Sequence, residues 1–283
     1  MSTARIQRLR AASRVEGNMN CFRSILVCAV VLTGALTGQA APGALAGLGQ
    51  QTVLTGESIP AAAQQLFLMT NQARAMAGVG PLRWDAAMAA GALEHCRRMV
   101  AEGPLAHRYG GEPELQMRAQ NAGAHFSLIA ENVALGSHVA TIHQGWLDSP
   151  GHRANLLNPQ VDSVGIAVVS GGGVLYAVAD YARTVQVLTR EQVESTVAAL
   201  IRSAGLFIVR DPADARAYCA TGSKDTSRSA FFIVWEDPDI STLPRHLADR
   251  VASGTYHSAV VGACAPQEAE PGFTSYRVAV ILN

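Results

Sequence analysis

A pair of β-rich runs separated by three glycines constrains the fold of this chain most strongly. Residues 163–170 and 174–181 are rich in valine and alanine, and Gly171, Gly172 and Gly173 lie between them. Two such runs around a short glycine loop are typical of a β-hairpin. Apolar residues recur at helical spacing before the hairpin, over 60–77, 85–102, 113–122 and 139–147. Helices followed by an antiparallel hairpin favour an α+β sandwich over a parallel βαβ sheet.

A second α+β unit of unknown type is expected to begin near Gln186. Thr189 and Gln192 form a capping-box pattern, and the apolar stripe that follows ends at Gly205. Another helix is expected to open at Pro244. β-rich runs lie at 206–209, 231–235, 256–263 and 276–282. This alternation describes a small domain with its own core.

The N-terminus has the pattern of an export signal. Five arginines precede an apolar run at 25–36, and Ala44-Leu45-Ala46 supplies a small-residue cleavage site before Gly47. The run is too short to span a bilayer comfortably, since about 20 residues are needed, although an uncleaved anchor is the alternative. We therefore expect a secreted or periplasmic protein with no stable membrane span after cleavage. The expected organisation is a signal peptide at 1–46, a linker at 47–57, and domains at 58–185 and 186–283.

Cysteine usage and charge limit the chemistry further. Removal of the leader leaves Cys96, Cys219 and Cys264, and the last two, both in the final third, are expected to form a disulfide. Cys96 lies in an expected helix and is interpreted as a buried apolar residue. The chain has no C-x-x-C pair, which argues against a thiolate zinc site. Its formal net charge of +0, with no basic stripe, argues against a nucleic-acid partner.

Short motifs in the first domain resemble, in order and spacing, the CAP superfamily of cysteine-rich secretory proteins, antigen-five allergens and pathogenesis-related proteins. The resemblance covers about residues 60–183, and its Ser-Pro-Gly-His segment is similar to the bacterial branch. It implies a three-layer α-β-α sandwich with a cleft lined by two histidines and two acidic residues. The motifs are Asn71-Gln-Ala-Arg74, Pro81-Leu-Arg-Trp84-Asp85, Leu105-Ala-His107, Glu131-Asn132, Trp146-Leu-Asp-Ser-Pro-Gly-His152, Val164-Gly-Ile-Ala-Val and Tyr176-Ala-Val-Ala-Asp-Tyr181.

Carried over to this chain, the resemblance implies a site made of His107, Glu131 and His152. Two histidines and a carboxylate can hold a divalent metal such as zinc and leave a coordination position open. The second acidic residue is expected three residues after Trp146, where this chain has a serine preceded by an aspartate. The other residues expected to line the ligand-binding cleft are Asn132, Asp148 and Ser149.

Each of these residues also has a structural interpretation. His107 can be solvated or bonded to a backbone carbonyl, and Glu131 beside Asn132 can hold the preceding loop by hydrogen bonds. The residues that precede Glu131-Asn132 are expected to form an irregular stretch. We expect two polar residues to brace the sandwich, two tryptophans to lie in the core, and two further histidines to lie at the surface: Asn71 and Arg74, Trp84 and Trp146, and His138 and His143.

The favoured function is a non-enzymatic binding or interaction module outside the cytoplasm, whose cleft holds a metal, a small molecule or an envelope ligand. The alternative is a metal-dependent hydrolase acting on peptide or cell-envelope polymer, with His107 and His152 as ligands and Glu131 polarising water. A serine hydrolase centred on Ser149 is disfavoured because no Gly-x-Ser-x-Gly elbow accompanies it. A third interpretation assigns recognition to the C-terminal domain and makes the CAP domain a scaffold.

Overall fold

The computed structural model describes residues 5–8, 60–222, 230–267 and 270–283. Most of the predicted signal peptide and the predicted linker lie outside these ranges. Within the predicted leader, β1 (Arg5–Arg8) pairs antiparallel with a strand of the first sheet. None of the helices formed by the described residues is both long enough and apolar enough to cross a membrane.

The first sheet has the strand order β1-β3-β5-β4-β2. Its long strands are β3 (Phe126–Gly136), β4 (Ser163–Gly171) and β5 (Val174–Thr184), while β2 (Arg83–Trp84) pairs parallel with β4. β4 and β5 form the predicted antiparallel hairpin. Gly172 and Gly173 in its turn have φ of 58° and 79°, a region that favours glycine.

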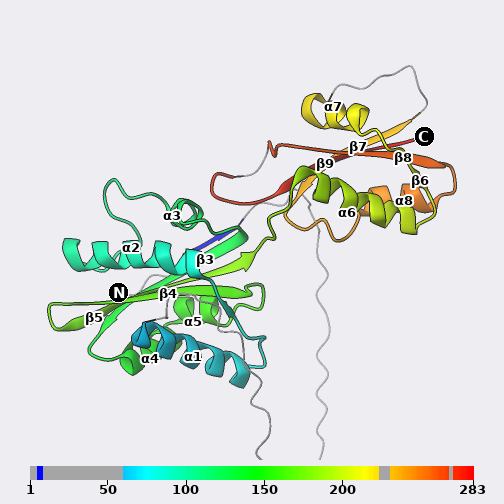
Figure 1. Ribbon diagram of the computed structural model, residues 1–283. Coiled ribbons are helices and arrows are strands. Elements are labelled where there is room, and N and C mark those ends of the chain that lie inside the picture. Colours follow the sequence, from blue (N-terminus) through cyan, green and yellow to red (C-terminus); the bar gives the residue numbers. More distant parts are fainter. Residues whose placement is uncertain (1–4, 9–59, 223–229, 268–269) are drawn as a thin grey trace, which may run out of the picture. The chain divides into compact units, whose positions relative to one another are not determined.

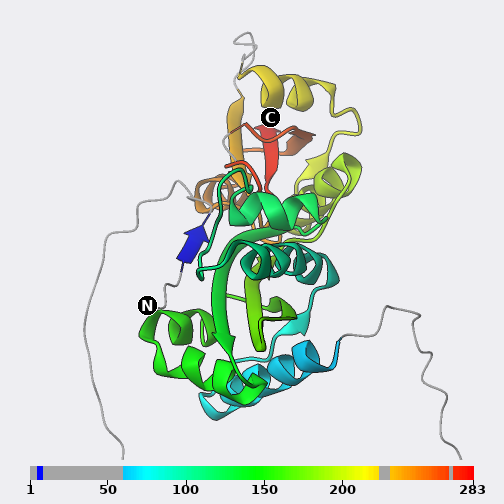
Figure 2. The same ribbon diagram turned by 90° about the vertical axis from the view of Figure 1, so that its left-hand side faces the viewer.

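Helices cover both faces of this sheet, as Figure 1 and, after a 90° turn, Figure 2 show. On one face lie α1 (Ala61–Met76), α4 (Val139–Asp148) and α5 (Pro150–Leu156). On the other lie α2 (Ala86–Glu102) and α3 (Leu115–Asn121). The core on the first face includes Leu66, Ile142, Trp146, Leu156 and Tyr181, and the core on the second includes Met88, Cys96, Met99, Ile129 and Val178. The predicted three-layer α-β-α sandwich is confirmed.

Two polar side chains brace the first face, as predicted. Asn71 accepts a hydrogen bond from the backbone N–H of Leu82 at 2.8 Å and donates to its carbonyl at 3.1 Å. The buried Arg74 donates to the carbonyls of Leu156 at 2.8 Å and Asn158 at 3.0 Å. These bonds join α1 to the segments that enter β2 and β4. Arg74 therefore has a structural role, which its place beside Asn71 in the motif already favoured.

Besides β1, three elements were not predicted from the sequence. The irregular stretch expected before Glu131 contains the first part of the eleven-residue strand β3, which is buried on both faces over most of its length, so its sequence does not alternate. Pro150, interpreted as a break, instead opens α5 as its first residue, where a missing N–H costs no hydrogen bond. α7 (Ala213–Thr221) follows Pro212 and had no strong apolar stripe to reveal it.

The C-terminal region contains a second sheet with the order β6-β8-β9-β7. The capping box of Thr189 and Gln192 is present at the start of the first helix of this region. Two helices share one core cluster on one face of the sheet, and α7 packs on the other. The boundary near Gln186 stays a prediction. The elements are α6 (Arg190–Ser203), β6 (Phe207–Ile208), α7, β7 (Phe231–Asp237), α8 (Arg245–Ala252), β8 (Ser258–Cys264) and β9 (Tyr276–Leu282).

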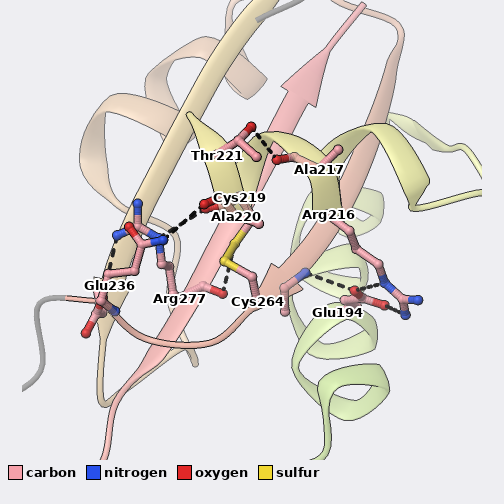
Figure 3. Close-up of a disulfide and its surroundings, with 11 residues drawn as sticks. Glu194, Arg216, Ala217, Cys219, Ala220, Thr221, Glu236, Cys264 and Arg277 are labelled. Carbon is pink, nitrogen blue, oxygen red and sulfur yellow. Dashed lines mark hydrogen bonds and ion pairs between the residues drawn. A yellow bond between two sulfur atoms is a disulfide. The ribbon is translucent and has the colours of Figure 1, made fainter. Parts of the chain in front are cut away.

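The cysteines are arranged as predicted. Cys219 of α7 and Cys264 at the end of β8 form a disulfide with a Cα–Cα distance of 5.8 Å (Figure 3). Cys96 is a free thiol buried in α2, and burial raises the pKa of this thiol to about 12. A thiol with so high a pKa carries almost no thiolate at neutral pH, so Cys96 acts as a core residue.

Candidate functional site

The candidate site is centred on Glu131 in the middle of β3, whose side chain is only 1% exposed. Its Oε1 lies 2.7 Å from Nδ1 of His107, and its Oε2 accepts a hydrogen bond from the guanidinium of Arg118. Both carboxylate oxygens of Glu131 are therefore already engaged by protein groups. The contact with Nδ1 fixes the orientation of the His107 ring against the carboxylate.

A second acidic residue, Glu112, extends this cluster. Its Oε1 lies 2.7 Å from Nδ1 of His95, and its Oε2 accepts from the backbone N–H of Tyr109 at 2.9 Å. Nε2 of His95 lies 3.0 Å from the carbonyl of Ala106 and 3.9 Å from Oε2 of Glu131. Both ring nitrogens of His95 thus face oxygen atoms of the protein.

Arg118 links the two halves of the cluster. Besides Glu131, it donates to the carbonyl of His107 at 3.2 Å and lies 3.8 Å from Oε1 of Glu112. Its side chain is 2% exposed, whereas that of His107 is 13% exposed. Among His95, Glu112, Arg118, Glu131 and His107, which we call the Glu131 cluster, His107 is the member with most access to solvent. A ligand would therefore reach this cluster through His107.

Burial and neighbouring charges shift the pKa values of two acidic residues, Glu131 and Asp180, in opposite directions. Burial alone would raise the pKa of Glu131, but the hydrogen bond from His107 and the charge of Arg118 outweigh it, and the pKa lies below its usual value. Asp180, fully buried on β5, is the register partner of Glu131. Burial, followed by the negative charge of Glu131, raises the pKa of Asp180 well above its usual range. The two shifts run in opposite directions, favouring the ionised form of Glu131 and the protonated form of Asp180.

The remaining predicted residues lie around α5. His152 is fully buried on this helix, and its carbonyl accepts a hydrogen bond from Asn132 at 2.9 Å. The side-chain oxygen of Asn132 accepts from Asn155 at 2.9 Å. Successive strand residues point to opposite faces, so Glu131 reaches the α2–α3 side of the sheet while Asn132 ties α5 to the other side. Asn132 thus braces α5 on the face of the sheet opposite to the one that Glu131 reaches.

The side chain of Asp148 lies at the surface and does not contact the Glu131 cluster. Asp148 is exposed and accepts a hydrogen bond from Gln144 at 2.8 Å, and Ser149 joins α4 to α5 without capping either helix by its side chain. The second acidic residue of the cluster is Glu112, not a residue near Trp146. Within the described ranges, no three His, Cys, Asp or Glu side chains converge into a group that could hold a metal ion.

Four residues of the site escaped the sequence reasoning: His95, Glu112, Arg118 and Asp180. His95 alone carried a usable signal, because it is a histidine on the apolar stripe of α2 and is fully buried. The expectation for His143 was also wrong. This residue is buried on the inner face of α4, and burial lowers the pKa of its ring, whereas His138 is exposed as predicted. Five residues, about 1.4 helical turns, separate these two positions, so their side chains do not share a face.

These observations define a class of protein: a three-layer α-β-α sandwich with a buried histidine–carboxylate–arginine cluster centred on a residue of β3. Residues 67–181 match the cysteine-rich secretory protein family, CAP. The chain therefore carries a CAP domain, followed by a second α+β region.

Similar proteins come from several bacteria. The chain is 26% identical over 127 residues to the uncharacterized protein YkwD and 31% identical over 110 residues to the uncharacterized membrane protein YlbC, both of Bacillus subtilis. These matches cover 44% and 37% of this chain, and the chain spans only 48% and 31% of those relatives. The family assignment thus concerns the CAP domain alone.

Solved structures give similar coverage. An extracellular protein containing a SCP domain from Bacillus anthracis is 31% identical with a TM-score of 0.41, over 44% of this chain and 40% of that one. An outer surface protein from Borrelia burgdorferi is 19% identical with a TM-score of 0.41, over 44% of this chain and 92% of that one.

Proposed function

We propose that the CAP domain is an exported, non-enzymatic binding module whose ligand is held by His107 and His152. One observation carries this proposal: both oxygens of Glu131 are engaged, by His107 and by Arg118. A carboxylate held in this way positions a histidine and is not available to accept a proton from water. The hydrolase alternative needs Glu131 for that task, so binding is favoured over turnover.

A divalent metal such as zinc remains one proposed ligand. The contact between Glu131 and Nδ1 of His107 fits the pattern in which a carboxylate orients a metal-binding imidazole. Glu131 itself does not fit as a ligand, because the Arg118 guanidinium occupies its second oxygen. The metal would therefore be held by His107 and His152, with the other positions left to water or to a bound molecule, and it would present a Lewis acid to that molecule.

Zinc is expected to stabilise the mature chain, taken from Gly47. A metal at about 100 times its dissociation constant adds roughly 2.7 kcal/mol by mass action, which raises the melting midpoint by about 5–10 °C for a domain of this size. Thermal melts with EDTA and then with zinc check this for the wild type and for His107→Ala/His152→Ala. The matched control is His138→Ala/His246→Ala, which removes two exposed histidines. If zinc still raises the melting midpoint of His107→Ala/His152→Ala, these two histidines do not form the metal site.

The second test addresses the ligand class and the reaction together. We expect the mature chain to sediment with purified peptidoglycan, and His107→Ala to lower the bound fraction several-fold, because His107 is the solvent-reaching member of the cluster. We expect no more reducing ends or free amino groups to be released from this suspension than from peptidoglycan incubated without protein. His138→Ala serves as control. Release that depends on His107 would establish the hydrolase instead, and failure to sediment would exclude an envelope polymer as the ligand.

A further inference from the structure

The C-terminal region has a cavity that the proposed function of the CAP domain does not use. It has a volume of about 690 Å³ and lies between α6, β6 and the middle of β8. Its lining includes the apolar residues Ala198, Leu206, Phe207 and Val261. Cavities of about 300–1,000 Å³ with a mainly apolar lining and a few polar groups are typical small-molecule sites.

The acidic group in this cavity is already neutralised. Glu194 accepts two hydrogen bonds from Arg216, each of 2.7 Å, and a third from the backbone N–H of Ala263 at 2.9 Å (Figure 3). Burial would raise the pKa of Glu194, but the bonds from Arg216 and Ala263 lower it below its usual value. Glu194 is therefore a fixed part of the wall that joins α6 to α7 and β8, and it adds no free negative charge.

Two arginines of the lining are not neutralised by the described part of the chain. Arg202 lies in the last turn of α6 and Arg210 follows β6, and both are exposed. Neither side chain has an ion pair or a side-chain hydrogen bond to another described residue. The cavity is thus cationic. Arginine favours carboxylate and phosphate because its planar donors match these groups.

An aromatic ring completes the set. Phe207 on the edge strand β6 is 67% exposed, one of the few large apolar side chains that the described residues leave in solvent. β6 pairs with β8 and is the outer strand of its sheet. An exposed ring beside cationic groups suits a ligand that has both an aromatic face and a negative charge.

We propose that this cavity binds an aromatic organic anion, with the carboxylate or phosphate on Arg202 and Arg210 and the ring against Phe207. A carboxylate and a phosphate share the chemistry that the arginines recognise. A neutral aromatic molecule would lack the charged contact, and an aliphatic anion would lack the ring contact. The site shares no residue with the Glu131 cluster, so its test is independent of the CAP-domain proposal.

Isothermal titration calorimetry with the mature chain tests this proposal. The probes are 2-naphthoate, 2-naphthyl phosphate and the neutral 2-naphthylmethanol. We expect at least one anion to bind, the neutral alcohol to bind at least about tenfold more weakly, and Arg202→Gln/Arg210→Gln to weaken the anion about tenfold or more, since hydrogen bonds to charged groups are the strong ones. Phe207→Ser should weaken both anions, and because all three positions are exposed, the melting midpoint should not change.

The matched control is Arg97→Gln/Arg153→Gln, which removes two exposed arginines of the CAP domain and changes the net charge equally. Comparing the two anions shows which acidic group the cavity prefers. A carboxylate site binds 2-naphthoate more tightly, and a phosphate site binds 2-naphthyl phosphate more tightly. Equal binding of the neutral alcohol, equal weakening by the control variant, or no binding of either anion would overturn the proposal.

Discussion

Replacing Arg118 with leucine is expected to lower the free energy of unfolding by about 3–5 kcal/mol, the range for breaking a buried ion pair from one side. Arg118 is 2% exposed and contacts Glu131 and Glu112, which are equally buried. Without the guanidinium, two buried carboxylates would lose the cation that they share. Urea unfolding at pH 7, followed by circular dichroism, gives the difference.

The control for this variant is Arg98→Leu. Arg98 pairs with Glu102 one turn away on α2, and both side chains are at least one-third exposed, so solvent screens the pair. Its loss should cost much less than the loss of Arg118. Similar costs for the two variants would show that the Glu131 cluster is not held by its charges. A large loss for Arg118→Leu alone would support the view that these charges position His107.

Replacing Gly165 with alanine is expected to destabilise the CAP domain by about 4 kcal/mol or more, an unusually large value for one methyl group. A Cβ on Gly165 would lie 2.1 Å from the backbone N of Ala89 and 2.3 Å from the backbone carbon of Met88. Helix backbone cannot rotate away as a side chain can, so α2 would have to lift from β4. Because α2 carries His95, the variant should also disturb the Glu131 cluster.

Gly145→Ala is the matched control. Gly145 lies within α4, where an added Cβ would have no neighbour within 4 Å. Alanine is the better helix former, so this variant should gain about 0.5–1 kcal/mol. Urea unfolding of both variants measures the contrast. A loss for Gly165→Ala below about 1 kcal/mol would show that α2 does not depend on close approach to β4.

A strand glycine also allows close approach of a helix in the second sheet. A Cβ on Gly262 of β8 would lie 2.3 Å from the backbone N of Arg216 and 2.6 Å from the backbone carbon of Ala215, both on α7. A glycine within a strand thus admits a helix backbone in each sheet. At β8 this approach also brings Cys219 of α7 to Cys264 and Arg216 to Glu194 (Figure 3). The disulfide and the wall of the proposed cavity therefore depend on the same close contact.

The sequence determined those elements whose pattern is local. The hairpin of β4 and β5 followed from two β-rich runs around glycines, and α1, α2 and α4 followed from apolar residues at helical spacing. The capping box at Thr189 and the pairing of Cys219 with Cys264 were also predicted correctly. In each case a few neighbouring residues, or the small number of available cysteines, restrict the structure enough to predict it.

Tertiary structure alone decided the composition of the site. His107 and Glu131 were predicted from motif resemblance, but Glu112, Arg118 and Asp180 come from a loop, a short helix and a strand with no local signal. β3 itself was missed because a strand buried on both faces loses its alternation, and the two polar residues at its centre point to opposite faces. Packing brings these groups together from 24 residues apart for His107 and Glu131 and from 13 for Arg118 and Glu131. A charge becomes part of a buried cluster only when its partners in space neutralise it, and sequence spacing does not record that neighbourhood.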